Sequence, residues 1–128
     1  MNKISNIIFD LTGVVLCEGI LNKELISWIR LNKLKYKFYI LTNNIREIKE
    51  MLPENVFIEI FTFSDTGFKK PDKRSFNYAL REIKSLPQDC LFIDDSKENI
   101  LAARGMGFNV LLFENNDLFF KEIINILN

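Results

Sequence analysis

Five short apolar runs recur along the chain, and a polar residue follows each of them. The runs occupy residues 7–9, 38–41, 56–61, 91–93 and 110–113. Continuous apolar runs of this length are typical of strands that are buried on both faces of a parallel sheet. The pattern therefore predicts about five parallel strands.

The segments between these runs carry apolar residues at helical spacing. Helices are expected at 21–29, 45–52, 76–83, 96–105 and 120–127. Asp72 and Ser96 are placed to cap two of them. The last helix is expected to bury an apolar stripe made of Phe120, Ile123, Ile124 and Leu127.

Strands and helices that alternate five times predict an α/β fold. We expect a three-layer, doubly wound sheet of about five parallel strands with right-handed crossovers. No linker or low-complexity segment divides residues 1–128, and Pro53, Pro71 and Pro87 lie between the periodic segments. The sequence therefore predicts a single domain.

The composition is that of an ordinary globular protein, with 48% apolar and 27% charged residues. Basic and acidic residues number 17 each, so we expect no nucleic-acid partner. No apolar run approaches the roughly 20 residues of a membrane span, and residues 1–6 lack a signal-peptide pattern. Because Cys17 and Cys90 are far apart, a reducing, cytoplasmic location is expected rather than a disulfide scaffold.

Histidine is absent from the sequence, which narrows the chemistry. Ser-His-Asp and Cys-His catalysis both require it, and so do most zinc and haem ligand sets. Any catalysis must therefore use carboxylates, hydroxyls, lysine and a hard metal ion.

Polar residues collect where three of the predicted strands end. Asp10, Thr42 and the pair Asp94-Asp95 directly follow apolar runs, and doubly wound sheets bind ligands at this edge. Three carboxylates near one point repel one another unless a cation joins them. Mg²⁺ is the common hard ion with oxygen ligands, so these residues predict a magnesium site.

Groups suited to a phosphoryl ligand accompany the carboxylates. Thr42 and the backbone amide of Asn43 can donate hydrogen bonds to phosphoryl oxygens, and Lys70 adds a positive charge. A carboxylate nucleophile, Mg²⁺, a hydroxyl and a lysine together are suited to phosphoryl transfer.

Four segments resemble the motifs of the haloacid dehalogenase-like (HAD) superfamily. Phe-Asp-Leu-Thr-Gly-Val-Val at 9–15 resembles the first motif, and Ile-Leu-Thr-Asn-Asn at 40–44 resembles the second. Segment 67–72, with its Lys-Pro pair, resembles the third, and segment 92–103, which begins Phe-Ile-Asp-Asp-Ser, resembles the fourth. The motifs occur in the family's order and span 7–113, most of the chain. The resemblance implies a HAD-like Rossmannoid core.

The resemblance also implies roles for the matching residues. Asp10 would be the nucleophile that becomes an aspartyl phosphate, and Lys70 would offset negative charge on Asp10 and on a phosphorylated substrate. The Mg²⁺ ligands would be Asp10, the carbonyl of Thr12, Asp94 and Asp95. The phosphate would be bound by Leu11, Thr42, Asn43 and Lys70. Two nearby residues receive no such role, because Lys69 is expected in solvent and Asn99 in solvent or at a helix cap.

Thr12 stands where the phosphatases of this family carry a second aspartate. That aspartate is the general acid/base, which protonates the leaving group and then activates the attacking water. A threonine hydroxyl cannot exchange a proton in this way near neutral pH, and losing such a group costs roughly 10²–10⁴ in rate. We therefore expect slow turnover.

The chain also lacks the helical cap that otherwise similar relatives insert between the first and second motifs. Residues 11–41, which number 31, have room for one predicted helix, and 62–69 is too short for another cap. The active site is therefore expected to be open to solvent. An open site suits a macromolecular substrate, or a homo- or hetero-oligomeric partner that covers it.

Two other interpretations stay open. One is an interaction module that keeps the fold, and Mg²⁺ binding, without turnover. The other is a receiver domain of a two-component system, which has a similar length and element order. Receivers place their acidic pair after the first strand, whereas here Asp94-Asp95 follows the fourth.

Overall fold

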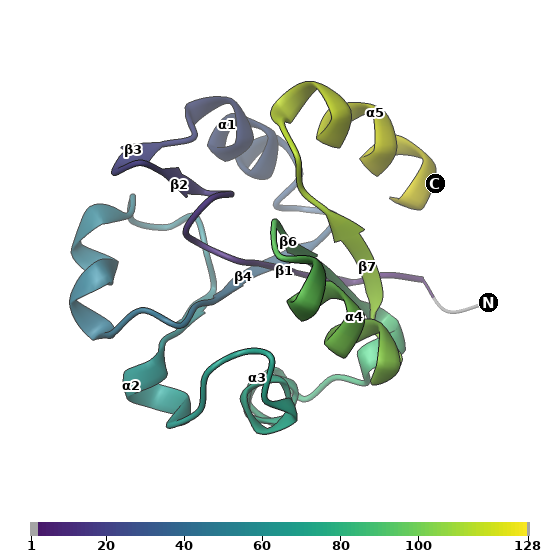
Figure 1. The fold of residues 1–128 in the computed structure, drawn as a ribbon. Helices are drawn as coiled ribbons and strands as arrows, with labels where there is room; N and C mark the ends of the chain where they lie inside the picture. Colours follow the sequence, from purple (N-terminus) through teal and green to yellow (C-terminus); the bar gives the residue numbers. More distant parts are fainter. Residues whose placement is uncertain (1–2, 128) are drawn as a thin grey trace.

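Strand β1 (Asn6–Phe9) lies at the centre of a five-stranded parallel sheet (Figure 1). It pairs with β4 (Lys37–Leu41) on one side and with β6 (Cys90–Asp94) on the other. The outer strands are β5 (Glu59–Phe61) and β7 (Asn109–Leu112), which gives the order β5-β4-β1-β6-β7. This order confirms the predicted α/β sheet.

The structure, a computed structural model, describes residues 3–127. Helices α1 (Lys23–Leu31) and α5 (Asn116–Leu127) cover one face of the sheet (Figure 1). Helices α3 (Lys73–Ile83) and α4 (Lys97–Gly105) cover the other face. The three layers are those of the doubly wound sheet that the sequence predicts.

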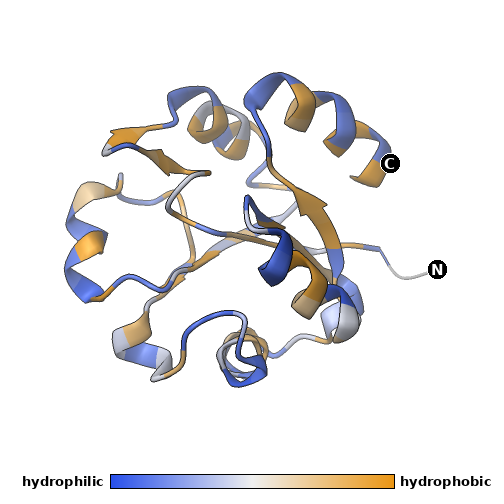
Figure 2. Cartoon of the chain, viewed as in Figure 1, coloured by the Kyte–Doolittle hydropathy of each residue, from blue (hydrophilic) through white to orange (hydrophobic). Residues whose placement is uncertain are grey.

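Successive residues of a strand point to opposite faces, so β1 contributes to two separate cores. Ile7 and Phe9 pack on the side of α1 and α5, whereas Ile8 packs on the side of α3 and α4. All three side chains are buried. Figure 2 shows the same division, since apolar colour runs along the strands and along the inner sides of the helices.

The two predicted helix caps are confirmed. The Asp72 side chain accepts a hydrogen bond from the backbone N–H of Arg74 at the start of α3. The Ser96 hydroxyl accepts one from the backbone N–H of Asn99 at the start of α4. Each side chain satisfies an N–H group that the helix itself leaves without a partner.

Two predicted elements differ from what the structure shows. The strand expected at 56–61 contains only Glu59–Phe61, because Asn55 has a positive φ of 60° and the chain turns there before it joins the sheet edge. The helix expected at 45–52 is a 3₁₀-helix, η1 (Arg46–Met51), and it has no buried residue to anchor a longer α-helix. Two short additional elements are α2 (Phe63–Thr66) and η2 (Pro87–Asp89).

A small β-hairpin was not expected from the sequence. It joins β2 (Leu16–Cys17) to β3 (Ile20–Leu21). Both residues of its turn, Glu18 and Gly19, have positive φ angles of 50° and 76°, as a type I′ turn requires. The usual signal for this turn is Asn-Gly or Asp-Gly, and Glu-Gly does not carry it.

The buried stripe of α5 is also shifted from the expected one. Phe119 and Ile123 are buried, whereas Ile124 is 60% exposed and Phe120 is only partly buried. The Phe119 ring packs against four aromatic rings, those of Phe9, Trp28, Phe113 and Phe120.

None of the helices in 3–127 is long and apolar enough to cross a bilayer.

This packing predicts a strong contrast within one helix. Phe119→Ala removes a buried ring and should lower the free energy of unfolding by about 3–5 kcal/mol. Ile124→Ala removes an exposed side chain and should change it by less than about 0.5 kcal/mol. Urea denaturation of both variants measures the difference, and equal losses would contradict the observed register of α5.

Candidate active site

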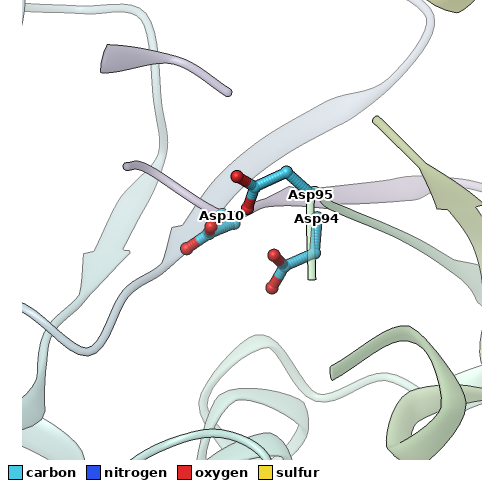
Figure 3. A group of neighbouring side chains, drawn as sticks. All are labelled: Asp10, Asp94 and Asp95. Carbon is cyan, nitrogen blue, oxygen red and sulfur yellow. The ribbon is translucent and has the colours of Figure 1, made fainter. Parts of the chain in front are cut away.

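Three carboxylates gather where β1 and β6 end (Figure 3). Asp10 follows β1, Asp94 is the last residue of β6, and Asp95 comes next. Each offers an oxygen, and the three oxygens lie within 4.8 Å of one another. The backbone holds the two strand ends together, because the Asp10 N–H donates a 2.8 Å hydrogen bond to the Ile93 carbonyl. The expected cluster at this sheet edge is therefore present.

Lys70 enters this cluster from the loop that precedes α3. Its ammonium lies 2.7 Å from Oδ1 of Asp10 and 3.1 Å from Oδ2 of Asp94. The side chain is only 1% exposed, and the ammonium also lies 5.4 Å from the centre of the Phe92 ring. Lys70 is thus a buried partner of two carboxylates and not a solvated loop lysine.

The Asn43 side chain fixes the backbone of Lys70. Its Oδ1 accepts a 2.7 Å hydrogen bond from the Lys70 N–H, and its Nδ2 donates to the Lys70 carbonyl at 3.2 Å. Two hydrogen bonds to one residue set both the position and the direction of the loop. The sequence predicted only that the backbone amide of Asn43 binds phosphate. It did not predict that the Asn43 side chain holds the Lys70 loop.

Asp94 is buried and fully engaged in hydrogen bonds. Besides Lys70, its oxygens accept from the Ser96 backbone N–H at 2.9 Å and from Nδ2 of Asn99 at 3.0 Å. Burial raises the pKa of Asp94, but the Lys70 charge and these two donors outweigh it and hold the pKa below its ordinary value. The expectation that Asn99 serves in solvent or as a cap is wrong, because its side chain orients Asp94 and Ser96 supplies the cap.

The other two carboxylates have raised pKa values. Burial raises the pKa of Asp10 from 3.8 to about 7, since the neighbouring Lys70 charge only partly offsets the loss of solvent and Asp94 adds repulsion. Burial and the adjacent Asp94 also raise the pKa of Asp95. Without a cation, Asp10 and Asp95 therefore keep their protons at pH values at which isolated carboxyl groups would lose them.

Gly13 makes room for the Asp95 carboxylate. The residue has a φ of +90°, and a Cβ added to it would lie 2.2 Å from Oδ2 of Asp95. No side chain can occupy that space unless Asp95 moves. The glycine of the first motif therefore leaves free the space that the Asp95 carboxylate occupies.

Thr12 and the loop around it present hydrogen-bonding groups toward the same edge. The Thr12 hydroxyl accepts a 3.0 Å hydrogen bond from Nδ2 of Asn44, and the Thr42 hydroxyl accepts one from the Asn44 backbone N–H at 3.2 Å. Within 3–127, no acceptor takes the backbone N–H groups of Leu11, Thr12 and Asn43. Three free amides beside a carboxylate suit an anionic ligand. Asn44 was missed by sequence reasoning, because its contacts join residues that are far apart in the chain.

The donor set fits a hard divalent cation. Three carboxylates and one ammonium carry a net charge of −2 when all are ionised, and carboxylate and carbonyl oxygens are the ligands that Mg²⁺ prefers. Asp95 is exposed and Asp10 is bound by Lys70 through Oδ1 alone, so both retain free oxygens. Asp94 already accepts hydrogen bonds from three donors, and its direct ligation of a metal remains a prediction.

No helical module lies over this edge between the first two motifs. Between β1 and β4 the chain contains only the β2–β3 hairpin and α1. At this edge Asp10 and Asp94 are buried, whereas Asp95 is exposed. Beside it lies a hollow of about 460 Å³ that begins at Gly13 and Cys17. Burial and the nearby Asp95 and Glu18 carboxylates raise the pKa of the Cys17 thiol.

Solved structures with the same fold cover nearly all of this chain. A predicted HAD-like family hydrolase from Porphyromonas gingivalis matches with a TM-score of 0.84 at 18% identity, over 98% of both chains. A HAD family enzyme from Bacteroides thetaiotaomicron, solved with magnesium and inorganic phosphate, matches with a TM-score of 0.77 at 15% identity. That match covers 91% of this chain and 99% of the other. At these identities the likeness shows a shared fold.

The curated relatives match this chain over only part of their own length. A sesquiterpene phosphatase from Aspergillus oryzae is 31% identical over 74 residues, which are 54% of this chain and 38% of that protein. The chain spans less than half the length of the curated relatives it matches. The family model for haloacid dehalogenase-like hydrolases matches residues 20–107, which are 88 of the 128 residues. On this match and on the shared fold, the chain belongs to the haloacid dehalogenase-like hydrolase family.

Proposed function

We propose that this protein is a Mg²⁺-dependent phosphatase or phosphotransferase that acts through an aspartyl phosphate on Asp10. The observation that carries the proposal is the buried Asp10 carboxylate, held 2.7 Å from the Lys70 ammonium and beside Asp94 and Asp95. The magnesium-and-phosphate complex of the Bacteroides enzyme and the phosphatase activity in the name of the Aspergillus relative support the same chemistry.

Asp10 attacks through Oδ2, because Lys70 holds Oδ1, and the second lone pair of Oδ1 is left for the metal ion. A bond forms from Oδ2 to phosphorus while the bond from phosphorus to the alcohol oxygen breaks, and the alcohol takes its proton from solvent. The free amides of Leu11, Thr12 and Asn43, together with the Thr42 hydroxyl, bind the phosphoryl oxygens. Water then attacks phosphorus, which frees the Asp10 carboxylate and releases phosphate and a proton.

Asp10, Asp95 and the Thr12 carbonyl are the groups that would hold Mg²⁺, with Asp94 next to them. When bound, the ion supplies positive charge that keeps the carboxylates ionised and offsets the charge of the phosphoryl group. Asp94 serves chiefly to place the Lys70 ammonium, since its oxygens already accept three hydrogen bonds.

Slow turnover follows from Thr12. Its hydroxyl accepts a hydrogen bond from Asn44, and it cannot supply or remove a proton near neutral pH. The same residue favours a second candidate function, in which the protein uses its fold and Mg²⁺ site to bind a partner without turnover. A macromolecular substrate fits the first candidate, and a protein that covers the open edge fits either.

Phosphorylation of Asp10 tests the proposal. Incubation with an aryl phosphate and Mg²⁺ should give a stoichiometric acyl phosphate that persists, because no general base speeds its hydrolysis. Thr12→Asp should raise turnover by up to roughly 10²-fold and lower the phosphorylated fraction, since Asn44 can orient the new carboxylate as it orients Thr12. Intact-mass spectrometry and steady-state rates measure both.

Asp10→Asn is the control for that experiment and should abolish both phosphorylation and turnover. If no acyl phosphate forms on the wild-type protein and Thr12→Asp is equally inactive while Mg²⁺ still binds, the enzymatic proposal fails. The partner-binding candidate then takes its place.

The contact between Gly13 and Asp95 gives a test of the metal site. Gly13→Ala should displace the Asp95 carboxylate and reduce the rise in melting temperature that millimolar Mg²⁺ produces by at least half. Gly19→Ala is the matched control, because Gly19 also has a positive φ but has open space around its Cα. Thermal melts with and without Mg²⁺ measure both variants, and an equal Mg²⁺ response in the two would remove Gly13 from this role.

The raised pKa of Asp10 predicts how stability depends on pH in metal-free buffer. Between pH 4 and about 7 the folded protein keeps a proton on Asp10 that the unfolded chain releases, so stability falls as the pH rises through this window. Asp10→Asn removes this contribution. Urea denaturation at pH 5 and pH 8 should show a smaller loss for the variant, by about 1–3 kcal/mol, and parallel losses would contradict the assignment.

A further inference from the structure

The hollow beside the active site lies between the β2–β3 hairpin and the loop that follows β7. It has a volume of about 460 Å³, which is within the range of small-molecule sites. Gly13 belongs both to its wall and to the catalytic cluster, because its Cα lies against the Asp95 carboxylate. The charge of Asp95 also acts on Cys17 of the lining, so the hollow adjoins the Asp95 side of the cluster.

Most of the side-chain amide groups of the hollow already have hydrogen-bond partners. Asn22 and Asn116 exchange two hydrogen bonds between their side-chain amides, at 2.8 and 2.9 Å. The Asn22 side chain also donates to the Val14 carbonyl and accepts from the Leu25 N–H. The Asn115 side chain accepts from the Leu118 N–H. These walls leave few groups to recognise a polar ligand.

What remains on the walls is largely apolar. Ile20 and Leu21 of the hairpin line the hollow together with Phe113, and Figure 2 shows the two strands of the hairpin in apolar colour. Ile20 is 69% exposed, so its side chain would gain from being covered.

The charge of the hollow fixes how a phosphate ester would lie. Its lining includes Glu114 and contains no lysine or arginine, so it disfavours a phosphate group. The free amides and Lys70 at the neighbouring edge favour one. A phosphomonoester would therefore place its phosphate over Asp10 and its alcohol part in the hollow.

From these observations we propose that the hollow is the leaving-group subsite, and that the substrates are phosphomonoesters of apolar alcohols rather than of sugars or of protein hydroxyls. This inference rests on the proposed function and adds the substrate class to it. It also gives a protein without a cap a means of selecting its substrate, since the selection is made by the hairpin and the β7–α5 loop of the core itself.

A series of straight-chain alkyl phosphates tests the substrate class. Phosphates from methyl to decyl differ little in leaving-group chemistry, so the length dependence of kcat/KM reports contact with the hollow. We expect kcat/KM to rise about fourfold for each added methylene until the hollow is filled, and glycerol phosphate and phosphoserine peptides to react no faster than methyl phosphate. A flat series, or a preference for the phosphopeptide, would overturn the proposal.

Two matched variants place the effect in the hollow. Ile20→Asn puts a polar group at its wall and should reduce the rise per methylene to less than 1.5-fold. Ile58→Asn makes the same change at an isoleucine that is 57% exposed and outside the hollow, and it should leave the chain-length dependence as in the wild type. If both variants behave alike, the hollow is not the subsite.

Binding of non-hydrolysable phosphonates separates this inference from the proposed function. With Mg²⁺ present, methylphosphonate should shift the NMR signals of Leu11 and Thr42, and hexylphosphonate should bind at least tenfold more tightly and also shift those of Ile20 and Phe113. If both phosphonates bind equally and the signals of Ile20 and Phe113 do not shift, the proposed subsite is contradicted, while the phosphate site is still supported. If neither binds, the proposed function fails, and the subsite fails with it.

Discussion

The buried ammonium of Lys70 is the charge on which the arrangement of the active site depends. It lies between Asp10 and Asp94, two carboxylates that would otherwise repel each other away from solvent. One ammonium cannot balance Asp95 as well, so the cluster retains a charge of −2 when every group is ionised. A site with this deficit either takes up protons, as the raised pKa of Asp10 indicates, or takes up a divalent cation. Two hydrogen bonds from the Asn43 side chain hold the backbone of Lys70 in place.

The topology of the sheet creates this concentration of charge. Strand β1 lies between β4 and β6, so the chain leaves β1 toward one side of the sheet and later returns on the other. Loops diverge at such a point, and the opening between them is where doubly wound sheets bind ligands. Asp10 and the Asp94-Asp95 pair are at this opening because of the strand order alone. Thr42 joins them from the end of β4.

The sequence allowed the sheet, the helix caps and the carboxylate cluster to be predicted, because all three depend on local patterns and on one rule about strand ends. Other features depend on contacts between distant residues and could not be predicted. Asn99 carries no local sign that it holds Asp94, and Asn44 none that it reaches Thr12. The hairpin escaped prediction because Glu18 adopts a positive φ that its residue type seldom takes. The sequence indicated Lys70 as a positive charge near the site, and the family's third motif implied its role, but nothing in the sequence indicated its burial between two carboxylates.

The central place of β1 has a consequence for how the protein is made. Asn6 pairs with Lys37 and with Cys90, so one of its two partners lies 84 residues further along the chain. At synthesis rates of roughly 5–20 residues per second, an apolar strand that has left the ribosome waits about 4 to 17 seconds before that partner exists. Until then Asp10 has neither Asp94 nor a completed sheet edge beside it. During this interval the apolar strand lacks one of its two partners, and the metal site can form only after Asp94 and Asp95 have been synthesised.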